Sequence, residues 1–399
     1  MKNDAFLLKM ADYFAISRYT NGIAVTVLDF ALEVADLLDE TPSANWSSVS
    51  ERLYLPIVDV PAPGFMAGTP VHTEYHGYNQ TKRLHINQAD VTLLQYPLGL
   101  RSNKRIFPSL PNSKNPDTQL AINDLLFWQP KSDNQVFYTG DSSNSIAWLE
   151  MGNRSAADAQ FDLAFTHMDL KHFNVFEERN TGTFGHLNFI TGAGGYQQNV
   201  VNGYLGLRYT KDGVDLRPVL PPHGVTSVKL RGLSLAGSRI DLLLGSEAVT
   251  LMLVEGPGAT VRSQGVPDAK LLPDRQPVTI KLCKGCGCGC PGGGCGCLSV
   301  VPGSSGQLCR FGSSEGAMQL PVLSLLVELT GIPRSFIPST YIDQSCWAAA
   351  QKSDPEYDTK PMVKGVRAEA CNSLTLFKCR GHTAHLPRSP RCLYSLSCA

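Results

Sequence analysis

Apolar positions in the first two hundred residues recur every three to four residues, which is the period of an α-helix. The longest such pattern lies between Thr20 and Leu38, where acidic residues occupy the opposite face. Its apolar stripe consists of Ile23, Val27, Phe30, Val34 and Leu38. We expect one amphipathic helix here, with the stripe packed against a core.

Shorter segments with the same period follow along the chain. They lie at Trp46–Leu53, Asn87–Leu94, Ile122–Phe127, Ser143–Glu150 and Ser155–Met168. Ser155 is followed three residues later by Asp158, a pair that resembles a capping box at the start of the last helix. Short helices separated by turns are typical of an α/α array, so the first part of the chain is predicted to be mainly α.

Beyond residue 206 the period of the apolar positions changes from 3.6 to 2, which indicates β-strands. Leu207–Tyr209 and Val214–Leu216 flank Lys211-Asp212-Gly213, a pattern that favours a hairpin. Further short strands are expected at Val225–Leu230, Arg239–Leu243, Val249–Leu253 and Val278–Leu282. Strands of this length separated by Gly and Pro predict a small antiparallel β-sandwich over residues 207–282.

Cysteine usage marks a third region, because all 12 cysteines lie at or after Cys283. Residues 283–399 are also rich in Gly, Ser and Pro, a composition typical of disordered low-complexity sequence. The alternative is a metal-thiolate cluster, since six cysteines stand at close spacing: Cys283, Cys286, Cys288, Cys290, Cys295 and Cys297. We therefore predict three parts, with boundaries at 1–206, 207–282 and 283–399.

Charge and hydropathy exclude several classes of partner. The 35 basic and 35 acidic residues balance, and the sequence pI is about 7.1, so nothing attracts the chain to nucleic acid or to an anionic membrane. The sequence holds no run of about 18 apolar residues. We expect no nucleic-acid partner and no membrane span. The first residues lack the pattern of a signal peptide, and the sequence indicates no compartment.

Candidate chemistry concentrates between Phe173 and Tyr209, where Glu177 and Glu178 precede a glycine-rich stretch. Successive side chains of an extended segment point to opposite faces, so only one of these carboxylates can face a pocket. The glycines lack the spacing of a phosphate-binding loop, and we expect them to form a tight turn that positions Glu178. The histidines are scattered, and we expect no metal site and no cofactor.

Several segments together resemble one enzyme family. They are YTNGIAVTVLDFALEVADLL at Tyr19–Leu38, HTEYHGY at His72–Tyr78, NQADVTLLQYPLGL at Asn87–Leu100 and NFITGAGGYQQNVVNGYLGLRY at Asn188–Tyr209. These segments resemble glycoside hydrolase family 65, in its acid-trehalase-like branch, and the resemblance runs to Leu282. It implies an (α/α)6 barrel followed by a β-sandwich, of which this chain would hold the C-terminal half of the barrel and the sandwich.

The resemblance also implies a mechanism with two carboxyl groups, one protonating the glycosidic oxygen and one activating water on the opposite face. Glu178 falls on the position of the base. The family's acid is a Glu-Tyr pair shortly before the Tyr19 segment, and the nearest counterpart here is Asp12-Tyr13. Either Asp12 is the acid, or the acid belongs to family sequence that this chain lacks. A substrate-binding Lys-Gln pair falls on Asn87 and Gln88.

The implied function is hydrolysis of a terminal α-glucosidic bond with inversion, in an oligosaccharide or in glycosylated hydroxylysine. Trehalose is the other substrate that the family indicates. One alternative is a non-catalytic family member or carbohydrate-binding protein, which the missing half barrel favours. Another is a disaccharide phosphorylase, which the negative charge of Glu178 disfavours because it would repel an incoming phosphate.

Overall fold

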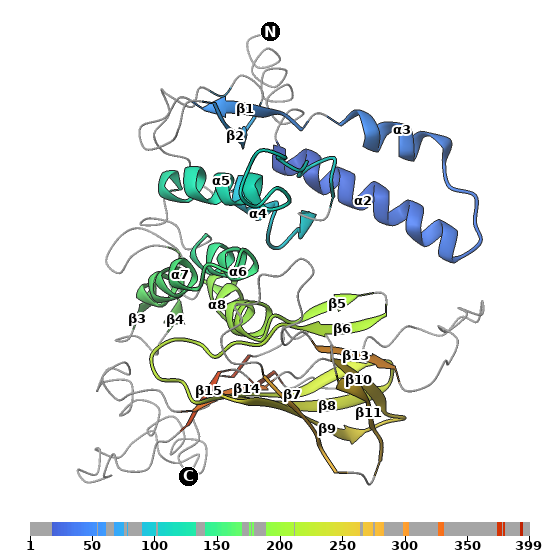
Figure 1. The fold of residues 1–399 in the computed structure, drawn as a ribbon, viewed down its shortest axis with the longest axis vertical. Helices are drawn as coiled ribbons and strands as arrows, with labels where there is room; N and C mark the ends of the chain where they lie inside the picture. Colours follow the sequence, from blue (N-terminus) through green and yellow to red (C-terminus); the bar gives the residue numbers. More distant parts are fainter. Residues whose placement is uncertain are drawn as a thin grey trace, which may run out of the picture. The chain divides into compact units, whose positions relative to one another are not determined.

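The computed structural model divides into two compact units, which are described separately (Figure 1). Unit 1 comprises residues 1–168 and 176–196, and unit 2 comprises residues 169–175 and 197–399. The structure describes residues 18–53, 55–60, 68–75, 78, 90–100, 103–132, 140–169, 175–176, 178, 189–210, 212–263, 266–273, 276–282, 298–302, 326–330, 373–376, 378–379 and 392–393.

The described part of unit 1 begins with two helices that pack side by side, α2 (Arg18–Leu37) and α3 (Ala44–Arg52) (Figure 1). The predicted helix from Thr20 to Leu38 is therefore confirmed. Its predicted orientation is wrong. Val27 is 59% exposed and Phe30 is 64% exposed, while Val25 on the opposite face is fully buried. The apolar stripe faces outward because small residues on the other face allow a closer fit to the core.

Gly22 shows how close that fit is. A Cβ added there would lie 2.7 Å from a methyl group of Leu94, which follows the short helix α4 (Asp90–Leu93). The core around this contact gathers residues from both helices and from later elements. It includes Val25, Val60, Val71, Val91, Leu94, Phe107, Leu120 and Trp128. The helix α5 (Gln119–Trp128) contributes the last two of these.

A β-hairpin joins this core, in a region where the pattern of residues predicts only helices and a loop. β1 (Ile57–Val60) pairs antiparallel with β2 (Thr69–His72), with Val58 opposite Val71. Each strand has only four residues, too few for the period of two to stand out in the sequence. The end of β2 places His72 and the residues after it inside the core of unit 1.

Three more described helices follow in unit 1: α6 (Asp141–Glu150), α7 (Arg154–Thr166) and α8 (Ile190–Gln198), whose last two residues belong to unit 2. The helix α7 is capped by Asn153, whose side chain accepts a hydrogen bond from the backbone N–H of Ala156 at 3.1 Å. The predicted cap at Ser155 is wrong. Its proposed partner Asp158 instead accepts a hydrogen bond from Arg154 at 2.7 Å.

The glycines of the central stretch lie inside α8 and do not form the tight turn that we expected. Gly192, Gly194 and Gly195 all fall between Ile190 and Gln198. A Cβ added at Gly195 would lie 3.4 Å from the Cβ of Ser142 on α6. The aromatic rings of Phe161 and Tyr196 stack with centroids 5.3 Å apart. Small residues in α8 therefore allow close helix packing.

Unit 2 contains two antiparallel sheets. The first has the strand order β11-β10-β13-β6-β5, and the second has the order β12-β9-β8-β7-β14-β15. The predicted hairpin is confirmed as β5 (Arg208–Thr210) and β6 (Gly213–Leu216), with Tyr209 opposite Val214. Other predicted strands appear as β7 (Ser227–Leu235), β8 (Ser238–Gly245), β9 (Ala248–Glu255) and β12 (Val278–Lys281). A short π-helix, η3 (Asn199–Tyr204), leads into this unit.

Alternation along the long strands gives each of them one buried side. In β8 the residues from Ser238 to Gly245 alternate between buried and more exposed positions, as the period of two requires. The remaining strands of the two sheets are β10 (Ala259–Ser263), β11 (Val266–Leu271), β13 (Leu298–Pro302), β14 (Leu326–Thr330) and β15 (Ser373–Leu376). Two-stranded pairs are formed by β3 (Met168–Asp169) with β4 (Val175–Phe176) and by β16 (Lys378–Cys379) with β17 (Cys392–Leu393).

The first sheet includes chain beyond the boundary that we predicted at Leu282. The strand β13 lies between β10 and β6, with Val300 opposite both Val261 and Val214. Leu298 and Val300 are fully buried. The closely spaced cysteines between the two segments lie outside the described residues. The boundaries of the three predicted parts stay predictions.

Candidate active site

Of the four residues proposed from the sequence, the structure describes one. Asp12, Asn87 and Gln88 lie outside the described residues, and their roles stay predictions. Glu178 stands two residues after β4 and is partly buried. Its proposed role as the base stays a prediction.

Glu74 is a buried carboxyl group that we did not predict as a site residue. Its backbone carbonyl accepts a hydrogen bond from the N–H of Arg18 at 3.1 Å, which ties the residue to the start of α2. Its Oε2 is buried without a hydrogen-bond partner. Burial, followed by the negative charge of Asp90, raises the pKa of Glu74 from 4.5 to about 8. Glu74 therefore keeps its proton at neutral pH.

Two further titratable groups surround Glu74. Burial raises the pKa of Asp90, the first residue of α4, above its ordinary value. Burial and the charge of Asp90 together raise the pKa of Tyr19. We call Tyr19, Glu74 and Asp90 the Glu74 cluster. Groups whose surroundings shift their pKa in one place are a common property of catalytic sites.

The backbone beside the Glu74 cluster is fixed by a buried pair. Nδ1 of His72 lies 2.6 Å from Oδ2 of Asp124, and Nε2 lies 2.7 Å from the carbonyl oxygen of Ile106. The indole N–H of Trp128 donates a hydrogen bond to the carbonyl of His72 at 2.9 Å. These contacts hold the end of β2 two residues before Glu74. In the sequence, Glu74 could have been noticed as a carboxyl group that closely follows a short apolar segment and precedes Tyr75 and Tyr78.

A second set of buried polar residues lies between α6 and α7. Nε2 of His167 lies 3.4 Å from Oδ2 of Asp141, and both side chains are buried. Burial raises the pKa of Asp141, and its contact with His167 opposes that shift. Asn144, three residues further along α6, is fully buried, and neither atom of its side-chain amide has a hydrogen-bond partner. Asp141 and Asn144 occupy one face of the helix because residues three apart are neighbours.

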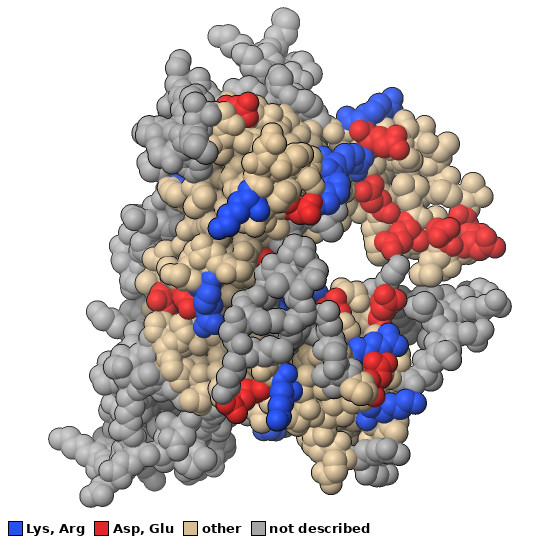
Figure 2. All heavy atoms as spheres, in the orientation of Figure 1, with Lys and Arg blue, Asp and Glu red and all other residues tan. Residues whose placement is uncertain are grey.

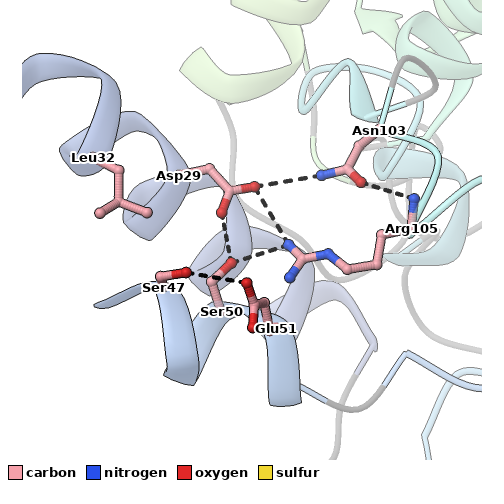
Figure 3. A pocket seen from close by; sticks show the side chains of 7 residues that line it. All are labelled: Asp29, Leu32, Ser47, Ser50, Glu51, Asn103 and Arg105. Atoms are coloured by element: carbon pink, nitrogen blue, oxygen red, sulfur yellow. Dashed lines mark hydrogen bonds and ion pairs between the residues drawn. The ribbon is translucent and has the colours of Figure 1, made fainter. Parts of the chain in front are cut away.

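A surface pocket of about 330 Å³ lies between α2, α3 and the turn at Asn103 (Figure 3). Asp29 accepts hydrogen bonds from Ser50 at 2.6 Å and from Arg105 at 3.3 Å. Arg105 also donates to Ser50 at 3.0 Å. Figure 3 shows these side chains pointing toward one another. The pocket contains none of the four predicted site residues, and its polar groups mainly connect the elements around it.

The residues that the structure describes lack two other features. No cluster of three or more His, Cys, Asp or Glu side chains there has an arrangement that could hold a metal ion. No helix in the same described ranges has both the length and the apolar character needed to cross a membrane.

Known proteins resemble this chain over a large part of its length. Protein-glucosylgalactosylhydroxylysine glucosidase from Danio rerio is 31% identical over 241 residues, which are 59% of this chain and 32% of that protein. The protein of the same name from Dictyostelium discoideum is 30% identical over 60% of this chain and 30% of its own length. The chain is related to the acid-trehalase-like branch of glycoside hydrolase family 65.

Other comparisons define the limits of this relationship. Periplasmic acid trehalase ATC1 from Saccharomyces cerevisiae is 25% identical over 51% of this chain and 16% of its own length. No protein-family model matches the sequence. The chain spans about a third of the length of the glucosidases that it matches. The resemblance inferred from the sequence motifs is confirmed at the level of the family branch.

Proposed function

We propose that this chain carries part of a glycoside hydrolase that cleaves a terminal α-glucosidic bond with inversion. The observation that carries the proposal is the similarity over 241 residues to proteins named as glucosidases. The substrate would be glucosyl-galactosyl-hydroxylysine or a trehalose-like disaccharide. The helices of unit 1 would then form part of an (α/α)6 barrel, and the two sheets of unit 2 would form the sandwich that follows it.

In this mechanism Glu178 is the base that activates a water molecule, and Asp12 is the acid that protonates the leaving oxygen. Gln88, with Asn87 beside it, would donate or accept hydrogen bonds to sugar hydroxyls. An inverting enzyme needs about 6.5–9.5 Å between its two carboxyl groups to leave room for the water. Glu74 is a second candidate for the acid, because its carboxyl group is buried, lacks a hydrogen-bond partner at Oε2 and belongs to a cluster of titratable groups.

A non-catalytic carbohydrate-binding protein is the alternative that one observation favours. The chain spans about a third of the length of the glucosidases that it matches, so the similarity supports only part of a catalytic protein. A disaccharide phosphorylase is less well supported, because an ionised Glu178 would repel phosphate.

Glucose release from trehalose, kojibiose and glucosyl-galactosyl-hydroxylysine, each with and without phosphate, distinguishes the three functions. Hydrolysis without phosphate that falls at least 100-fold in Glu178→Gln supports the proposal. A comparable loss in Asp12→Asn or Glu74→Gln then identifies the acid. Glu40→Gln is the matched control, since Glu40 is exposed just after α2. Absence of glucose release under every condition leaves only the binding protein.

A further inference from the structure

Asp141 is a buried carboxylate that the proposed mechanism does not use. Many acidic side chains of the chain are visible at the surface in Figure 2, whereas Asp141 is 1% exposed. A carboxylate removed from water needs partners that compensate for the lost hydration. Its Oδ2 lies 3.4 Å from Nε2 of His167. This contact opposes the rise in pKa that burial causes at Asp141, so it favours the ionised carboxylate.

His167 stands at the start of a short β-ribbon that leads to Glu178. It follows α7 directly, and the next residue, Met168, begins β3. The strand β3 pairs with β4, and Glu178 stands two residues after β4. Each strand has two residues, and within the described chain the pair belongs to no larger sheet. A two-stranded ribbon of this size is not stable by itself in water, so it needs an anchor outside its own hydrogen bonds.

Two buried side chains at the start of the ribbon can anchor it. His167 is 2% exposed and Met168 is 8% exposed. The apolar contacts of Met168 have no preferred direction. The contact between His167 and Asp141 joins one nitrogen to one oxygen, and it therefore favours a single orientation of the ribbon.

The other end of this contact is held firmly. Asp141 is the first residue of α6, and its residues from Asp141 to Trp148 are all buried. The helix also packs along α7. Because α6 cannot shift without disturbing this packing, Asp141 is a fixed point against which His167 and the ribbon can be held.

We propose that Asp141 is a positioning residue for Glu178: through His167 it anchors β3 and β4, and the ribbon in turn holds Glu178 in place. This role rests on the proposed function, in which Glu178 is the base. Displacing a catalytic group by about 1 Å can reduce a rate about 100-fold. Asp141 does not touch the substrate in this arrangement, so its loss should lower kcat and leave KM nearly unchanged.

Amide hydrogen exchange tests the anchor in the full chain, whether or not the chain is active. Asp141→Ala should raise the exchange of the amides in β3 and β4 at least tenfold, because the ribbon loses its directional contact. Asp141→Asn should raise it less, since the amide oxygen can still accept a hydrogen bond from Nε2 of His167. His167→Leu should match Asp141→Ala, and the double variant should show no further increase.

Rates of glucose release test the link to Glu178. Asp141→Ala should lower kcat at least tenfold and leave KM within about twofold of its original value. Asp141→Asn should recover most of the lost kcat. In a chain that already carries Glu178→Gln, Asp141→Ala should add no further loss, because the base that it positions is gone.

Asp158→Ala is the matched control. Asp158 is a carboxylate of α7 that accepts a hydrogen bond from Arg154 and is partly exposed. Its removal deletes an acidic group from the same helix pair and leaves Asp141 and His167 unaltered. Exchange of β3 and β4, and kcat, should stay as in the unaltered chain. Where Asp141→Ala does not fold, as judged by circular dichroism, His167→Leu and Asp141→Asn carry the test.

Three outcomes would overturn the proposal. The first is unchanged exchange of β3 and β4 in Asp141→Ala. The second is exchange that rises equally throughout α6 and α7, because the substitution then loosens the helices in general. The third is the expected exchange in an active chain whose kcat does not fall. The expected exchange in a chain that releases no glucose in any variant would instead support the anchor and contradict the proposed function.

Discussion

Nδ1 of His72 lies 2.6 Å from Oδ2 of Asp124, and both side chains are completely buried. The carboxylate also accepts a hydrogen bond from the backbone N–H of His72 at 2.8 Å through its other oxygen. On the far side of the ring, Nε2 faces the carbonyl oxygen of Ile106, which can only accept, so Nε2 carries a proton. Every polar atom of this pair thus has a partner.

Asp124→Ala should lower the free energy of unfolding by about 3–5 kcal/mol, because it leaves the buried imidazole and the backbone N–H of His72 without an acceptor. Chemical denaturation followed by circular dichroism measures this change. Asp124→Asn is the matched control, since its amide can accept from the N–H of His72 and donate to Nδ1. It should lower stability by only about 1–2 kcal/mol. Equal losses in both variants would mean that the hydrogen bonds of the pair contribute little.

Glu74 should make the stability of the protein depend on pH. Its pKa is about 8 in the folded protein and about 4.5 when unfolded, so the folded state binds the extra proton between these values. Stability therefore falls as pH rises from about 4.5 to about 8, by an amount on the order of 3–5 kcal/mol, and levels off above that range.

Glu74→Gln should remove most of this decline, because the amide has nearly the same shape and does not titrate. Midpoints of urea unfolding measured from pH 5 to pH 9 would show the difference. Glu40→Gln changes an exposed carboxyl group and should leave the pH dependence as it is in the unaltered chain. A parallel decline in the Glu74→Gln variant would show that another group carries the effect.

The cap of α7 predicts different effects at two neighbouring positions. Asn153→Ala should destabilise the protein by about 1 kcal/mol, since its side chain satisfies the free N–H of Ala156. Ser155→Ala should change stability by less than about 0.5 kcal/mol, because Ser155 is exposed and lies within the helix. Thermal unfolding of the two variants would measure this difference. A larger loss of stability in Ser155→Ala than in Asn153→Ala would mean that Ser155 is the cap, as expected from the sequence.

Gly213 lies where β6 approaches β13, with φ of 153°. A Cβ at this position would overlap the carbonyl oxygen of Val300, so Gly213→Ala should destabilise the first sheet of unit 2 by roughly 1–3 kcal/mol. At Gly245 the nearest atom to an added Cβ is 3.7 Å away, and Gly245→Ala should have little effect. Amide hydrogen exchange of β13 would record the difference. Equal protection in the two variants would contradict the close approach.

The local pattern of residues predicted six strands of the second unit, namely β5, β6, β7, β8, β9 and β12. Strands such as β8 alternate over eight residues, and β5 and β6 pair as the predicted hairpin. The short strands β1 and β2 were missed, because four residues give too little alternation to recognise. The strand β13 was missed for a different reason: its partners Val261 and Val214 are far away in the sequence.

Some residues of the candidate site could be inferred from the sequence, and others only from the structure. Motif similarity indicated the family branch, which the glucosidase relatives confirm. It also indicated Glu178 as the base, and that role stays a prediction. Glu74 could not be ranked from the sequence, since the shift in its pKa arises from burial and from Asp90, sixteen residues further along the chain. Charge and burial of this kind depend on neighbours that only the folded chain brings together.

By itself, the sequence determined that segments such as Thr20–Leu38 are helical and that segments such as Arg239–Leu243 are extended, because those preferences depend on residues only a few positions apart. It could not determine which side of α2 would face the core. Tertiary structure decided that point: Gly22 lets α2 approach Leu94 closely, and Val25 fills the core while Val27 and Phe30 remain exposed. Packing depends on the shapes of both partners, and a hydrophobic pattern in one helix specifies only one of them.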